Sequence, residues 1–97
     1  MGKPEARVEN YLRKRVKETG GKIRKLRFVG RAGALDNLIW YKFPRVAVIE
    51  CKAEGEDIDL RTPQGRVFLG MKADGWPSYV VRSHAEVDAV IREMTHA

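Results

Sequence analysis

The sequence has few of the features that mark secreted, membrane-spanning or disulfide-rich proteins. Its 97 residues include one cysteine, Cys51, which excludes an internal disulfide framework and a cysteine-rich zinc site. No apolar run approaches the roughly 20 residues that a helix needs to cross a bilayer. Residues 1–5 contain no apolar segment of the kind that begins a secretory signal. We therefore expect a protein that stays in the reducing cytoplasm and has no membrane partner.

Acidic residues are scarce in the first third of the chain. The whole sequence has 19 Lys+Arg against 13 Asp+Glu, a formal charge of +6. Residues 1–31 contain 11 basic and three acidic residues, a net charge of +8, which leaves −2 for residues 32–97. A basic surface indicates a polyanionic partner, and nucleic acid is the commonest one. The plainer interpretation is a solvated lysine-rich helix face that binds nothing.

The hydrophobic pattern predicts one α/β domain spanning residues 1–97. A content of 43% hydrophobic and 33% charged residues suits a globular fold, and the length suits one domain with one core. Apolar spacing, caps and turn residues predict helices at 4–19, 62–75 and from 83 onward, and strands at 22–29, 35–40, 46–52 and 78–82. This order, αβββαβα, indicates a mixed four-stranded sheet flanked by helices.

A charged pair ends the most apolar strand. Residues 46–49 are apolar, and Glu50 and Lys52 follow them on one face, because alternate residues of a strand share a face. A carboxylate and an ammonium at the end of a buried strand need partners or a metal, since unpaired buried charge is costly. The simpler alternative is an ordinary surface ion pair, which contributes little.

A symmetric hairpin places a second carboxylate beside the first. If strands 35–40 and 46–52 are joined by the turn 41–45, Leu38 pairs with Val48 and Asp36 with Glu50. Two carboxylates directly opposite on one face repel, and a divalent cation between them removes that penalty. Oxygen ligands with open water positions suit Mg²⁺ or Mn²⁺. Carboxylates, a metal, a lysine and a basic surface together point to phosphodiester hydrolysis.

The spacing Asp36…Glu50-x-Lys52 resembles the core of PD-(D/E)xK nucleases. The segments 33–36 and 48–52, followed by Gln64, are similar to the VRR-NUC branch of that superfamily, and the likeness covers nearly the whole chain. It implies a restriction-endonuclease-like core and a Mg²⁺- or Mn²⁺-dependent endonuclease. Stand-alone domains of this length resemble phage proteins that act in the host cytoplasm as homodimers and resolve four-way (Holliday) DNA junctions.

The resemblance assigns roles residue by residue. Asp36 and Glu50 would bind the metal, with the backbone carbonyl of Cys51 as a further ligand. Lys52 would be the catalytic lysine. Gln64 would support the catalytic site from the first turn of its helix.

The resemblance also implies a glutamate from the first helix in the metal site. Glu5 and Glu9 both fit and share a helix face, and Glu5 matches the family's opening better. The chain departs from the family at Leu35, where a proline is usual, and at Asn37, where a basic residue that contacts DNA is common.

Several basic residues are expected to contact DNA phosphates. They lie in the basic first third, in the glycine-containing loop before Asp36, and beside Gln64: Arg24, Lys25, Arg31, Arg61 and Arg66. Two other functions fit the same sequence. One is a nucleic-acid-binding module without catalysis, which uses the basic third alone. The other is a structural or regulatory protein whose acidic loop 54–59 binds a basic partner.

Overall fold

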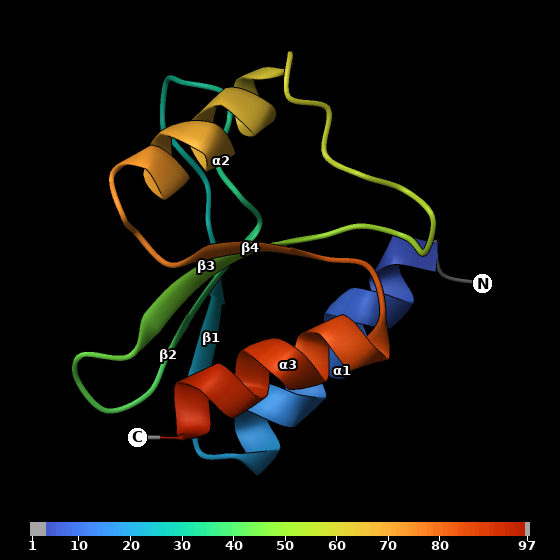
Figure 1. Cartoon of the computed structure of the whole chain (residues 1–97), viewed down its shortest axis with the longest axis vertical. Helices are drawn as coiled ribbons and strands as arrows, with labels where there is room; N and C mark the ends of the chain where they lie inside the picture. The colour runs from blue at the N-terminus through green and yellow to red at the C-terminus, as the bar shows by residue number, and fades with distance from the viewer. Residues whose placement is uncertain (1–3, 97) are drawn as a thin grey trace.

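A mixed four-stranded sheet with three helices forms the fold, and the computed structural model describes residues 4–96 (Figure 1). The elements in chain order are α1 (Pro4–Glu18), β1 (Lys22–Lys25), β2 (Asn37–Trp40), β3 (Val46–Cys51), α2 (Pro63–Ala73), β4 (Ser78–Val81) and α3 (His84–Thr95). Within residues 4–96, no helix is long and apolar enough to cross a membrane. The predicted order of helices and strands is confirmed.

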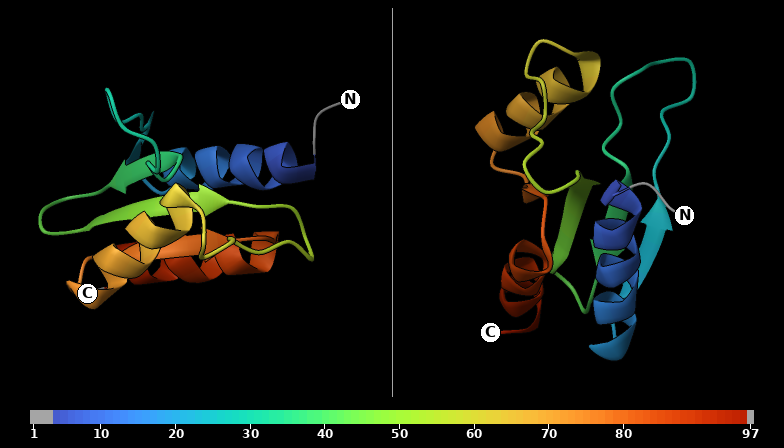
Figure 2. Two further views of the ribbon diagram at one scale, coloured as in Figure 1. Left: turned by 90° about the horizontal axis from the view of Figure 1, so that it is seen from above. Right: turned by 90° about the vertical axis from the view of Figure 1, so that its right-hand side faces the viewer.

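The strands lie side by side in the order β1-β2-β3-β4. Neighbours joined by a turn or a loop are antiparallel, whereas β3 and β4 are parallel because the chain crosses over through α2 between them. Helices α1 and α3 pack against each other, and α2 lies apart from both (Figures 1 and 2). The predicted mixed sheet is therefore confirmed.

One apolar core lies between the sheet and the pair α1 and α3. Helix α1 buries Val8, Leu12 and Val16, which share a helix face at a spacing of four residues. The sheet contributes alternate residues to the same core, among them Ile39 and Ile49, both fully buried. The opposite face of the sheet carries the intervening residues, and the charged end of β3 belongs to that face.

The first strand is shorter than predicted. It ends at Lys25 rather than at residue 29, and Val29 is 98% exposed. The partner strand sets this limit: β2 begins at Asn37, which pairs with Lys25, so no further residues of the two strands pair. One more hydrogen bond, from the N–H of Leu26 to the carbonyl of Asp36 at 2.8 Å, follows it. Residues 27–29 consequently belong to the loop that leads to Asp36.

The predicted caps of α2 and α3 are present. The Thr62 hydroxyl accepts a hydrogen bond from the N–H of Gly65 at 3.1 Å, and the Ser83 hydroxyl accepts one from the N–H of Glu86, also at 3.1 Å. The Glu86 carboxylate does not close a capping box onto Ser83. It accepts instead from the N–H of Arg82 at 2.7 Å, one residue earlier, which ties the end of β4 to α3.

Candidate active site

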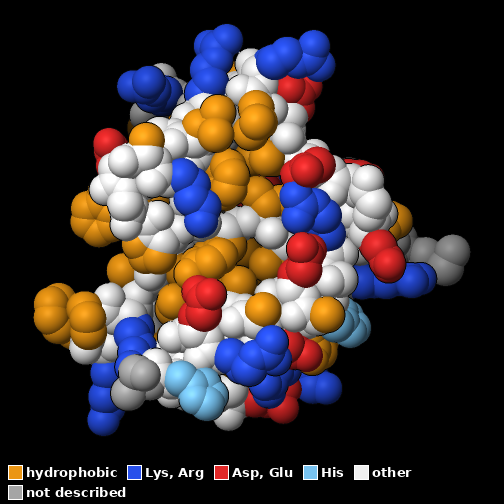
Figure 3. Space-filling model, viewed as in Figure 1, with side chains coloured by type: hydrophobic (Ala, Val, Ile, Leu, Met, Phe, Trp, Pro, Cys, Tyr) orange, Lys and Arg blue, Asp and Glu red, His pale blue; other side chains and the backbone are white. Residues whose placement is uncertain are grey.

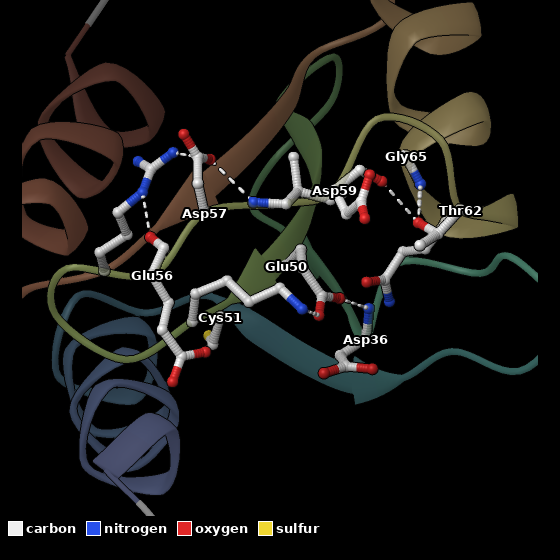
Figure 4. A network of polar contacts seen from close by, with 12 residues as sticks. Asp36, Glu50, Cys51, Glu56, Asp57, Asp59, Thr62 and Gly65 are labelled. Carbon is white, nitrogen blue, oxygen red and sulfur yellow. Dashed lines mark hydrogen bonds and ion pairs between the residues drawn. The ribbon is translucent and has the colours of Figure 1, made fainter.

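The β2–β3 hairpin brings Asp36 and Glu50 together. Leu38 pairs with Val48 as the symmetric hairpin predicts, and Asn37 pairs with Ile49. The next step of this register is Asp36 opposite Glu50. The N–H of Asp36 donates a hydrogen bond to Oε1 of Glu50 at 3.0 Å (Figure 4). Asp36 itself stands one residue before β2, at the mouth of the loop 26–36.

Glu50 is a buried carboxylate whose loss of solvation is only partly offset by its neighbours. It is 3% exposed at the end of an apolar strand. Burial, and secondly the charge of Asp36, raise the pKa of Glu50 above its ordinary value of 4.5, although the Asp36 N–H and Lys52 pull the other way. The surroundings therefore disfavour the ionised carboxylate.

Lys52 is the cation nearest to this carboxylate. Its Nζ lies 3.5 Å from Oε2 of Glu50, and its side chain is 21% exposed. The backbone N–H of Lys52 donates to the carbonyl of Val81 at 2.9 Å, so β4 holds the residue although β3 ends at Cys51. The backbone of Lys52 is thus held in place, and its ammonium group reaches both the buried carboxylate and the solvent.

Gln64 ties the start of α2 to the loop that carries Asp36. Its Nε2 donates to the carbonyl of Ala34 at 3.2 Å. The same loop approaches α2 at Gly33, where a Cβ would lie 2.9 Å from the carbonyl oxygen of Pro63 and where φ is +112°. Glycine alone suits that conformation and that contact. The structure therefore places Gln64 as a support of the Asp36 loop.

A hollow of about 230 Å³ lies beside Asp36, and Glu5 and Glu9 of α1 line it. Burial acts to raise the pKa of Glu9, but the hydrogen bonds and charges of Lys25 and Arg13 outweigh it and hold the pKa below its ordinary value. The contacts are short: Glu9 lies 2.6 Å from Nζ of Lys25 and 3.0 Å from Nη2 of Arg13. Glu5 forms no ion pair with any residue of 4–96, so its carboxylate faces the hollow uncommitted.

The donor set fits a divalent cation with two carboxylate ligands. Within residues 4–96, no three His, Cys, Asp or Glu side chains converge closely enough to hold a metal ion by themselves. Asp36 and Glu50 supply paired carboxylates, and the carbonyl of Cys51 ends the same strand. Oxygen donors with the remaining positions left to water suit Mg²⁺ or Mn²⁺.

The neighbouring Cys51 and Asn37 belong to the other face of the sheet. Burial raises the pKa of the Cys51 thiol to about 12, so it stays protonated in the core, as its position predicts. Asn37 is fully buried, with Nδ2 3.9 Å from Sγ of Cys51 and Oδ1 without a hydrogen-bond partner among the described residues. Asn37 shares the inward face of Ile39 and so makes no contact with solvent, in line with the departure from the family's usual basic residue at this position.

The basic residues expected to bind DNA have different surroundings. Arg31 and Arg66 line one hollow of about 240 Å³ between the loop 26–36 and α2. Arg61 pairs with Asp59 at 3.1 Å, and the Arg24 guanidinium lies 5.5 Å from the Trp40 ring centroid. With Lys25 held by Glu9, Arg31 and Arg66 are the most available of the five.

A solved protein structure shares this fold closely. The structure described as "VRR_NUC domain" is 32% identical to this chain, with a TM-score of 0.83, and the match covers 94% of this chain and 97% of the other. Searches against family models and against curated proteins find no match.

Proposed function

Because the chain belongs to the VRR-NUC family of nuclease domains, we propose that it is a divalent-metal-dependent endonuclease that cuts DNA at four-way junctions. The observation that carries the proposal is the hairpin that sets Asp36 against Glu50, with Lys52 3.5 Å away. A pair of apolar residues at these positions would stabilise the fold better, since burying like charges costs stability.

In the proposed site, Asp36, Glu50 and the carbonyl of Cys51 would hold Mg²⁺ or Mn²⁺. A glutamate of α1 would complete the site through a bound water, since no third carboxylate of residues 4–96 lies close enough to bind the ion directly. We propose Glu5 because Glu9 is bound by Arg13 and Lys25. When bound, the ion supplies positive charge to the scissile phosphate and lowers the pKa of a water molecule. The ionised form of Glu50, which burial and secondly the charge of Asp36 disfavour, would be stabilised by such a charge.

The protein's own residues position and neutralise the reacting groups. In hydrolysis, a water molecule gives up a proton to solvent as its oxygen bonds to phosphorus, a phosphorus–oxygen ester bond breaks, and the leaving oxygen takes up a proton from solvent. Lys52, whose side chain is 21% exposed, lies where it can donate hydrogen bonds to the phosphate oxygens as negative charge grows on them. Gln64 keeps the Asp36 loop in place through Ala34. Loss of this support would move one carboxylate away from the other.

The basic surface would hold the DNA beside this acidic centre. The +8 charge of residues 1–31 attracts the polyanion, and Arg31 and Arg66 flank the site from the loop 26–36 and from α2. Two symmetric cuts at a junction require two active sites, so the working unit is proposed to be a two-fold homodimer, acting in the cytoplasm.

A cleavage panel tests the proposal. A synthetic four-way junction, a flap, a nicked duplex and a linear duplex are incubated with Mg²⁺, with Mn²⁺ or with a chelator. The wild type should cut the junction in either metal and stop in the chelator. Lys52→Ala should lose at least about 100-fold in rate, the lower range for a catalytic proton donor or acceptor. Arg92→Ala, which replaces an exposed arginine of α3 outside the basic residues 1–31, is the matched control and should cut normally.

The alternative function, binding without catalysis, predicts a different result. It gives salt-sensitive DNA binding, no metal-dependent cleavage of any substrate, and no effect of Glu50→Gln on affinity. Cleavage that survives in both Lys52→Ala and Asp36→Ala would exclude the site described here.

A further inference from the structure

The turn between β2 and β3 carries an aromatic side chain that contacts almost nothing. Phe43 is 97% exposed, and the turn forms one end of the molecule (Figures 1 and 2). Single exposed apolar residues are common and prove nothing alone. The exposed Phe43 becomes informative together with an apolar hollow that the same hairpin helps to line.

An apolar hollow of about 200 Å³ opens beside this turn. It is lined by Leu38, Val46, Val48, Met71, Trp76 and Pro77, together with Ala47. Trp76, at its rim, is 59% exposed. No charged side chain lines it. In Figure 3, apolar side chains accordingly gather along the left margin of the molecule, over the turn and below the end of α2.

The protrusion and the hollow each have a charged neighbour, and the two charges are opposite. Lys42 precedes Phe43, and Asp74 stands two residues before Trp76. Both side chains are exposed, and neither forms an ion pair with any other residue of 4–96. The surface therefore combines an apolar protrusion with an apolar hollow, and a basic residue with an acidic one.

We propose that this surface is the contact between two copies of the chain. Each Phe43 fills the partner's hollow, and each Lys42 lies against the partner's Asp74. Five residues separate Phe43 from Val48, about 16 Å along a strand at 3.3 Å per residue. Two hairpins laid antiparallel about a two-fold axis near Val46 exchange their protrusions, which is the self-complementary arrangement that a two-fold dimer requires.

The chemistry of the hollow favours a second copy over DNA. Phosphates gain nothing from an apolar hollow without a cation, and the exposed Asp74, two residues before Trp76, would repel them. A standard interface buries about 800 Å² per partner, about an eighth of this protein's 6495 Å². The contact also leaves the reaction centre free, because Asp36 and Glu50 lie at the opposite end of the hairpin from the turn.

Sedimentation equilibrium from nanomolar to high micromolar protein tests the contact. This inference rests on the proposed homodimer, but the assay reads mass and not cleavage. The wild type should be a dimer, and Phe43→Asp should weaken the dimer at least about 30-fold, the loss typical of a central aromatic contact. Val29→Asp makes the same kind of change at a residue that is 98% exposed elsewhere, and should leave the dimer intact.

Charge reversal gives a second, independent readout. Lys42→Glu and Asp74→Lys should each weaken the dimer, and the double variant should recover most of the loss, because the pair is re-formed with opposite signs. Lys14→Glu, the matched reversal on α1, should have no effect. Far-ultraviolet circular dichroism checks that each variant folds.

Several outcomes would overturn the contact. They are a monomeric wild type at the highest concentration, a Phe43→Asp variant that dimerises normally, or a double reversal no better than the singles. A Phe43→Asp variant that stays dimeric but loses affinity for junction DNA would assign the surface to DNA instead. A wild-type dimer that Phe43→Asp disrupts, but that cuts no DNA, would support the contact and overturn only the proposed nuclease activity.

Discussion

Replacing Glu50 by glutamine should stabilise the metal-free protein and remove its response to divalent metal. The Glu50 carboxylate is 3% exposed and faces the charge of Asp36. Glutamine keeps the shape and an acceptor oxygen for the N–H of Asp36, which donates at 3.0 Å, but it carries no charge. The substitution therefore removes a cost of folding that the site bears for its function.

The expected gain near neutral pH is about 1 kcal/mol. A buried polar group without adequate partners costs about 1–3 kcal/mol, and the lower end applies because Lys52 and the Asp36 N–H already compensate part of the charge. For a domain of this length, about 1 kcal/mol corresponds to a rise of about 4–8 °C in melting temperature. With metal at ten times its dissociation constant, the wild type should gain about 1.4 kcal/mol and the variant almost nothing.

The difference between the two proteins should depend on pH in one direction. Burial and the charge of Asp36 raise the pKa of Glu50 in the folded state above 4.5, so the folded state binds its proton more tightly than the unfolded chain does. Below about pH 4.5 the wild type is protonated in both states and should match the variant. As pH rises from the ordinary pKa to the raised one, the wild type should become less stable than the variant. At higher pH the difference in their free energies of unfolding should stay constant.

Thermal melts of both proteins across this pH range, with chelator and with Mn²⁺, measure these effects. Glu54→Gln, which neutralises an exposed carboxylate three residues after Cys51, is the control and should change neither stability nor the metal response. A Glu50→Gln variant that melts below the wild type at pH 7, or that gains as much stability from Mn²⁺, would refute the assignment of Glu50 as a strained metal ligand.

Three further changes probe the reaction and the fold. Lys52→Ala should abolish cleavage of a four-way junction while leaving Mn²⁺-induced stabilisation in place, and loss of both would show a structural role. Leu12→Ala should cost about 2–5 kcal/mol in urea unfolding because Leu12 is fully buried, and a loss below about 1 kcal/mol would contradict the described core. Gly65→Ala should destabilise the protein, since its Cβ would lie 2.2 Å from the carbonyl oxygen of Asp59. Gly70→Ala, in the same helix with open space around it, should raise the free energy of unfolding by up to about 1 kcal/mol. Equal effects of the two substitutions would contradict this packing.

Local chemistry made the fold predictable. The apolar stripe of α1, the Thr62 cap and the Ser83 cap are short-range signals, and each lies where the sequence predicts it. The hairpin register followed from a five-residue turn between two apolar runs, and Leu38 indeed pairs with Val48. A slip of one residue would have turned the apolar residues of both strands to the wrong face, so the pattern permits one register.

Short-range sequence signals did not predict where the first strand ends or which polar side chain is buried. The segment 26–29 has strand-like composition, but it needed a partner strand to stay in the sheet, and β2 begins too late to provide one. Asn37 stands where the resembled family commonly has a basic residue, whereas its place opposite Ile49 in the register buries it. Pairing across the sheet decides both outcomes, and it depends on residues distant in sequence.

The sequence by itself determined the order of helices and strands and the spacing Asp36…Glu50-x-Lys52, because helix and strand periods and turn lengths are local properties. Only the tertiary structure decided how those groups meet: the burial that raises the pKa of Glu50, the binding of Glu9 by Lys25, and the contact of Gln64 with the loop before Asp36. The surface around Phe43 likewise combines a turn with the far end of α2. Burial, charge partners and surface shape arise from packing between distant segments, and no local pattern encodes them.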